Sequence, residues 1–117
     1  MINVTVTYVK TSSRGKDVEV VDSIEITGHA NSGPYGQDLV CASVSSIITG
    51  AANAIWNNNC FQIILEEGHA LIKRTSRPSD EIAFECHDDV TLSVTDVMLR
   101  TVAESNRKFI RITEKFN

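Results

Sequence analysis

The sequence lacks an excess of positive charge, because its 15 acidic residues outnumber its 11 basic residues and leave a formal net charge of −4. A general nucleic-acid binder needs a positive surface to neutralise phosphates, so we expect no direct binding of nucleic acid. An acidic surface instead favours a basic protein partner. The chain also lacks an apolar run as long as a bilayer is thick, so we expect no membrane span.

Cysteines are few and irregularly placed. The three residues, Cys41, Cys60 and Cys86, are odd in number and share no repeated spacing, which is not typical of a disulfide framework. No apolar segment follows a basic one near the N-terminus, so no secretory signal is expected. Together these features predict a cytoplasmic protein with reduced thiols.

Complete metal-binding and phosphate-binding motifs are also missing. Residues 86–89 (CHDD) contain metal-ligand types, but no second pair stands at the spacing of a zinc finger. A strand end followed by a helix cap is therefore the better interpretation of this segment. Gly33 and Gly36 lack the Lys-Ser or Lys-Thr pair that follows a phosphate-binding loop. We expect neither a metal nor a cofactor.

The hydrophobic pattern predicts strands and helices within a single domain, residues 1–117. The predicted strands are residues 2–9, 17–27, 61–65, 69–75, 81–86 and 108–113, and the predicted helices are residues 38–56 and 88–106. The adjacent pair Val20-Val21 interrupts the alternation of its strand and suggests a bulge. The continuous apolar run at 61–65 suggests a buried strand.

Each predicted helix has one apolar stripe at a period of 3.6 residues. The first stripe comprises Val40, Val44, Ile47, Ile48, Ala51, Ala52 and Ile55, and the second comprises Val90, Val94, Val97, Met98, Thr101 and Val102. Trp56 is expected to anchor the end of the first helix in the core. Lys73 and Arg74 are expected to form a small solvated basic patch with Arg77.

Because each helix has a single stripe, both should cover the same or adjacent sheet surface. The pattern predicts an α+β two-layer sandwich in the order β-β-α-β-β-(β)-α-β, with a mixed or mainly antiparallel sheet and two helices. A sheet edge left open at this size often pairs with a second copy, so we expect a homodimer.

Cys41 is the first residue whose position indicates chemistry. It stands three residues after Asp38, within the first turn of the predicted helix. Unpaired backbone N–H groups and the helix dipole favour a thiolate there, and the thiolate is the reactive form of cysteine. The alternative is structural, since free cysteine is a common small core residue.

His29 ends the second predicted strand, one short loop before the helix that carries Cys41. A Cys–His pair within hydrogen-bond reach is the minimum for thiol nucleophilic catalysis; the alternative is a loop histidine without a partner. Asp38 either orients His29 in the manner of a triad acid or caps the helix. The backbone N–H groups of Cys41 and Ala42 are candidate oxyanion donors, because a first turn leaves such groups unpaired.

These residues resemble a known signature. Gly28-His29-Ala30, Gly36, Asp38 and Val40-Cys41-Ala42-x-Val44-Ser45 are similar to G-H-A…G-x-D-x-V-C-A-A-V-S of the ribosomal-processing cysteine protease family, Prp. One departure is Ser43, which stands where the family usually has a second alanine.

The resemblance implies a small bacterial cysteine endopeptidase, typically a homodimer. Such enzymes remove a short N-terminal extension from a large-subunit ribosomal protein and cut after a hydrophobic, phenylalanine-bearing motif. The family's nucleophile falls on Cys41 and its base on His29. The loop associated with substrate access comprises Asn31, Ser32, Gly33, Pro34, Tyr35 and Gly36.

Two alternatives stay open. One is a non-enzymatic, dimeric, ribosome-associated interaction module in which Cys41 and His29 are vestigial. The other is a different thiol chemistry, either redox sensing or acyl transfer. A redox role needs a resolving cysteine near Cys41, and Cys60 lies beyond the helix, which disfavours that role.

Overall fold

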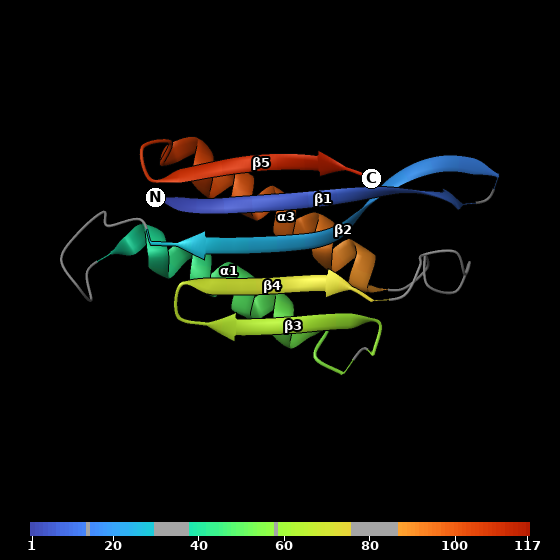
Figure 1. Cartoon of the computed structure of the whole chain (residues 1–117), viewed down its shortest axis with the longest axis horizontal. Helices are drawn as coiled ribbons and strands as arrows, with labels where there is room; N and C mark the ends of the chain where they lie inside the picture. The colour runs from blue at the N-terminus through green and yellow to red at the C-terminus, as the bar shows by residue number, and fades with distance from the viewer. Residues whose placement is uncertain (14, 30–37, 58, 76–86) are drawn as a thin grey trace.

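The computed structural model describes residues 1–13, 15–29, 38–57, 59–75 and 87–117. In chain order the elements are β1 (Ile2–Ser13), β2 (Lys16–Gly28), α1 (Leu39–Ala54), β3 (Phe61–Glu66), β4 (His69–Arg74), α3 (His87–Ser105) and β5 (Ile110–Phe116) (Figure 1). This succession confirms the predicted order of strands and helices. The additional strand predicted at 81–86 lies outside the described residues.

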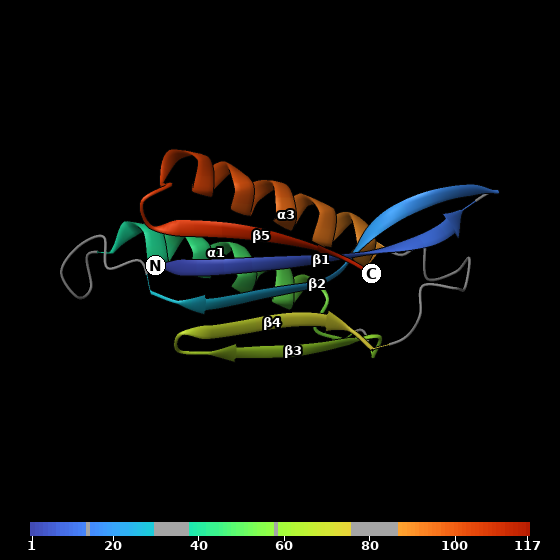
Figure 2. The same ribbon diagram turned by 45° about the horizontal axis from the view of Figure 1, so that its top comes forward.

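The strands form one five-stranded sheet in the order β3-β4-β2-β1-β5. Neighbouring strands are antiparallel except β1 and β5, which run parallel, so the sheet is mixed. Both helices lie on the same face of the sheet (Figure 2), and the predicted α+β two-layer architecture is confirmed. Among the described residues, no helix is long and apolar enough to cross a bilayer.

The predicted bulge in β2 is present. The β1–β2 ladder pairs Thr7 with Ser23 but Tyr8 with Val21, so Asp22 is the extra residue. An extra residue reverses the alternation of side chains along a strand. Val21 therefore lies in the same core as Ile24 and Ile26, although an odd-numbered residue of a regular strand would face the other side.

Helix α1 packs on the sheet through the predicted stripe. Its buried residues are Val40, Val44, Ile48, Ala51 and Ala52, and Ile55, the C-cap, is buried with them. The prediction for Trp56 is wrong, since this side chain follows the C-cap and is 64 % exposed. Ile55 fills the position at the helix end that Trp56 was expected to fill.

The predicted stripe of the second helix is also wrong. Val90, Val94, Val97 and Met98 are between 46 % and 64 % exposed. The face of α3 that is buried instead consists of Leu92, Thr95, Asp96, Leu99 and Ala103. Polar side chains can face the sheet here because they are paired: Asp96 accepts from Tyr8, and the Thr95 hydroxyl donates to the Thr91 carbonyl at 2.7 Å.

Arg74 is not the solvated basic residue that the sequence predicted. It is 7 % exposed, lies 5.0 Å from the centre of the Phe61 ring, and forms an ion pair with Asp89 in the first turn of α3. Its guanidinium also donates to the Val21 carbonyl at 3.2 Å. A buried cation that is paired and hydrogen-bonded fixes the start of α3 on the sheet. Arg77 lies outside the described residues.

Tyr8 joins β1 to α3 and β5. Its hydroxyl donates to Asp96 Oδ2 at 2.6 Å and accepts from Arg100 Nη2 at 2.7 Å. Arg100 also pairs with Glu114 on β5, and the Tyr8 ring stacks on Phe116 with 5.3 Å between ring centres. Burial of the phenol, followed by its hydrogen bond to Asp96 and the charge of Asp96, raises the pKa of Tyr8 to about 12.

This raised pKa predicts a loss of stability in alkali. The folded state holds the Tyr8 proton more tightly than the unfolded chain does. The contribution of this proton to the free energy of unfolding is therefore complete below pH 10 and is lost as the pH rises toward about 12. We expect the free energy of unfolding, measured with urea, to fall over this window more steeply in the wild type than in Tyr8→Phe. The variant keeps the ring but has no proton to lose, so parallel falls in the two proteins would contradict this role of Tyr8.

Candidate active site

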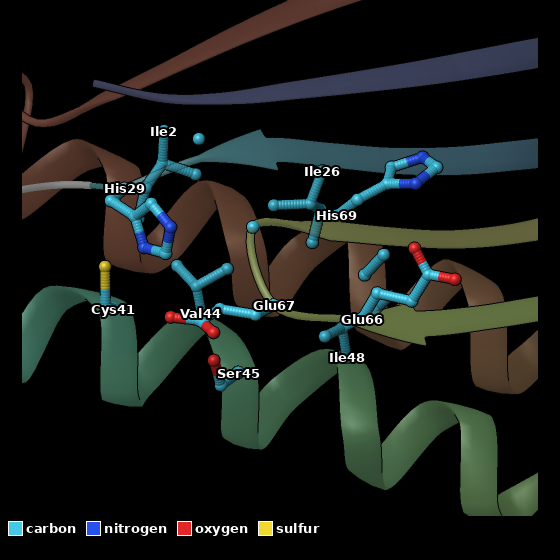
Figure 3. A pocket seen from close by; sticks show the side chains of 13 residues that line it. Ile2, Ile26, His29, Cys41, Val44, Ser45, Ile48, Glu66, Glu67 and His69 are labelled. Carbon is cyan, nitrogen blue, oxygen red and sulfur yellow. The ribbon is translucent and has the colours of Figure 1, made fainter.

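Three segments that are distant in the sequence meet at one edge of the sheet: the end of β2, the start of α1 and the β3–β4 turn. They enclose a pocket of about 170 Å³ (Figure 3). His29 and Cys41 both line this pocket, and the sulfur of Cys41 points toward the His29 ring. The predicted pair is therefore brought together from two different elements.

The main chain before His29 is held closely. Gly28, the last residue of β2, has a φ of +90°, and a β carbon there would overlap the carbonyl of Met1. Its N–H donates to the Gly68 carbonyl at 3.0 Å, and the Met1 amino group donates to the His29 carbonyl at 2.6 Å. Only glycine combines this conformation with so close an approach. The backbone that carries His29 is thus fixed from β1 and from the β3–β4 turn.

Cys41 occupies the third position of α1 and is partly exposed. Asp38 is the N-cap: it has an extended backbone and its Oδ1 accepts the Cys41 N–H at 2.9 Å. Of the two roles left open for Asp38, the structure shows helix capping. The predicted helix start and the placement of Cys41 in its first turn are confirmed.

The reasoning behind the oxyanion prediction is wrong. The Cys41 N–H is bound by the Asp38 side chain, and the Ala42 N–H donates to the Asp38 carbonyl at 3.1 Å. Capping satisfies the first of these groups, and the second is already far enough along the helix to make the ordinary i to i−4 bond. Neither amide is therefore an unpaired donor.

The two serines that follow Cys41 in α1 differ in what they contact. Ser45 lines the pocket, whereas the Ser43 hydroxyl donates to the Leu39 carbonyl at 2.7 Å, a bond within its own helix. The loop from Asn31 to Gly36 lies outside the described residues. Asp88 and Asp89 lie in the first turn of α3, and the strand end predicted before them lies outside the described residues.

Family comparison agrees with this geometry. The family model described as cysteine protease Prp matches residues 1–111. The chain belongs to the Prp family. It is therefore a cysteine-type endopeptidase, a hydrolase, and the resemblance drawn from residues 28–45 is confirmed.

Prp relatives cover the chain from end to end. The ribosomal processing cysteine protease Prp of Staphylococcus aureus is 30 % identical over 119 residues, which cover 98 % of this chain and 100 % of that protein. The Prp of Bacillus subtilis is 48 % identical over 46 residues, 39 % of this chain and 41 % of that protein. A crystal structure of S. aureus Prp with a covalently linked product peptide is similar with a TM-score of 0.74 and 28 % identity, covering 98 % of this chain and all of that one.

The Prp signature in the sequence does not reveal the wall of the pocket opposite α1. Glu66, Glu67 and Gly68 of the β3–β4 turn line the pocket, with His69 beside them. His69 Nε2 lies 2.9 Å from Glu25 Oε2. Nothing local to these residues marks them as neighbours of Cys41, because strand pairing brings them there.

The capping role of Asp38 leads to a test in which stability and activity separate. Asp38→Ala should lower the free energy of unfolding by about 1 kcal/mol, whereas Asp38→Asn should lose much less, because asparagine caps nearly as well. Urea unfolding measures both, with Asp17→Ala, at an exposed position of β2, as the control for loss of one negative charge. If Asp38→Asn stays stable but loses peptidase activity, Asp38 acts as a triad acid and capping is not its main role.

Proposed function

We propose that the chain removes a short N-terminal extension from a large-subunit ribosomal protein by cutting after a hydrophobic, phenylalanine-bearing motif, with Cys41 as nucleophile and His29 as general base and then acid. The observation that carries this proposal is the placement of both side chains on one pocket, with the sulfur directed toward the imidazole (Figure 3). Family membership supports it, as do S. aureus Prp structures with product and substrate peptides.

The proposed reaction is an acyl transfer in two steps. His29 takes the proton of Cys41 while the sulfur attacks the scissile carbonyl, and the imidazolium then gives that proton to the leaving amine. The resulting thioester is hydrolysed by water, with His29 again acting as the base. The residues 31–36 are proposed to hold or cover the substrate.

Oxyanion stabilisation by the Cys41 or Ala42 amide requires a rearrangement, because both amides are occupied before substrate arrives. The Cys41 amide is the better candidate of the two. Its partner is a side-chain carboxylate of the N-cap, which can turn aside without unwinding the helix, whereas the Ala42 amide is part of the helical ladder.

An apolar wall beside Cys41 supports the choice of substrate. Ile2, Ile26, Val44 and Ile48 line the pocket that holds the catalytic pair. Transfer of an aromatic or aliphatic side chain from water to such a surface is favourable. A hydrophobic residue next to the cut peptide bond is therefore the substrate feature that this pocket suits best.

We also propose that the protein is a homodimer, joined through the helices. A groove of about 350 Å³ runs between α1 and α3, and none of the described residues that line it is charged. Val90, Val94 and Met98 on its α3 side are exposed, and Ile47 and Gly50 form part of its α1 side. An exposed apolar surface built from two adjacent elements is typical of a protein interface, and the same uncharged surface on a second copy is complementary to it.

The protease proposal is tested with a peptide that copies the N-terminal extension of the organism's own ribosomal protein, read by mass spectrometry. Wild-type protein should make a single cut after the aromatic motif, and Cys41→Ala should make none while unfolding at the same urea concentration. Cys60→Ala, a second partly exposed cysteine away from this pocket, should cut normally.

Retained cleavage by Cys41→Ala would overturn the mechanism. No cut by a wild type whose Cys41 is alkylated rapidly would leave a reactive thiol with a different substrate. No cut together with a slowly alkylated Cys41 would favour the non-enzymatic interaction module.

The dimer proposal is tested by placing a charge in the groove. Val94→Asp should halve the mass measured by light scattering, because a carboxylate buried at an apolar interface has no partner. Ser93→Asp adds the same charge to an exposed neighbour that does not line the groove, and it should leave the mass unchanged. A wild type with the mass of one chain would contradict the proposal.

A further inference from the structure

The His29 imidazole rests on the backbone of the β3–β4 turn. A β carbon built on Gly68 would lie 3.1 Å from His29 Nε2, 3.8 Å from Cε1 and 3.9 Å from Cδ2. Three ring atoms therefore cover the one face of Gly68 that a side chain would occupy. The first of these distances is shorter than ordinary van der Waals contact, so a side chain at residue 68 would displace the ring by a few tenths of an ångström.

Gly68 also holds the main chain beside the ring. Its carbonyl accepts the Gly28 N–H at 3.0 Å, at the last residue of β2 before His29. One residue thus fixes both the backbone from which His29 projects and the surface on which its imidazole lies. The ring faces Cys41 across the pocket from this position (Figure 3).

We propose that Gly68 is a positioning residue for His29, and that the β3–β4 turn sets the orientation of the imidazole toward Cys41. The inference rests on the proposed function, since it assumes that His29 serves Cys41. Proton transfer requires the base to lie within hydrogen-bond reach of the thiol, so a ring displaced by a fraction of an ångström loses rate rather than substrate affinity.

The alternative explanation is that Gly68 serves only to give the turn its positive φ. Another turn glycine of this chain provides the control for that explanation. Gly15, at the β1–β2 turn, has a φ of +77° and Gly68 a φ of +74°, but a β carbon on Gly15 would meet nothing within 4 Å. The backbone strain of a Gly→Ala substitution is therefore matched at the two positions. What differs is the contact with His29.

The experiment compares Gly68→Ala with Gly15→Ala in peptide cleavage and in the alkylation of Cys41 by iodoacetamide. Both variants should lose similar stability to urea. Gly68→Ala alone should lower kcat by about tenfold to a hundredfold with KM changed less than about twofold, and should slow alkylation of Cys41 relative to Cys60 in the same sample. Gly68→Asn keeps a β carbon on a residue that tolerates positive φ, and should show the same loss if Gly68→Ala folds poorly.

A double-mutant cycle with His29→Ala decides whether the effect passes through His29. Gly68→Asn should have no further effect on the alkylation of Cys41 once His29 is removed, because non-additivity is the signature of residues that act as one unit. An undiminished effect in the His29→Ala background, or a kcat for both Gly68 variants equal to that of Gly15→Ala, would overturn the proposal. If His29→Ala itself changes neither cleavage nor alkylation, the proposed function fails instead, which is a distinct result.

Discussion

The packing of α1 against the sheet is the interaction on which the rest of the site depends. Val40, Val44 and Ile48 bury one side of the helix in the core, and this burial fixes both the direction of α1 and its rotation about its axis. Cys41 lies one residue from a buried position, so the same packing that anchors the helix leaves the thiol at the rim of the core. A nucleophile on a helix that is held by core packing is held in place with that helix.

Close backbone approach at the opposite side completes the site. β1 begins, β2 ends and the β3–β4 turn reverses within one small region, and the crowding is relieved by glycine at 28 and at 68. Each of these residues adopts a positive φ, and each lacks the β carbon that would strike a neighbour. His29 is therefore positioned by main-chain geometry on both sides, which involves no flexible side chain and little entropy.

The features that depend on the local pattern of residues were predicted correctly. Those that depend on which face of a helix packs on the sheet were missed. Alternation in β1 and β2 and the stripe of α1 were sufficient to predict which side chains are buried, because in each element the apolar face is the one that packs in the core. In α3 two faces compete, and the more apolar one is exposed. Asp96 lies inside because Arg100, one turn further along α3, and Tyr8 on β1 satisfy its carboxylate. A pattern within the helix contains no sign of Tyr8.

The same distinction applies to the candidate site. Cys41, His29 and Asp38 are close in sequence and have a recognisable spacing, so they were found from the sequence alone. The pairing of β2 with β4 brings the β3–β4 turn to the pocket, and that pairing joins residues more than 40 positions apart. Long-range pairing is set by the whole sheet rather than by any short motif, which is why the sequence does not identify Gly68 as a neighbour of the site.

The exposed apolar face of α3 has a consequence for α1. The groove between the helices includes Ile47, Gly50 and Ala54, while Cys41 and Ser45 line the pocket from another side of the same helix. α1 therefore has a core face, a pocket face and a groove face. A second copy seated in the groove would enclose α1 between two packed surfaces and restrict its motion. Because Cys41 is carried by that helix, an interface far from the pocket would steady the nucleophile without contacting the substrate.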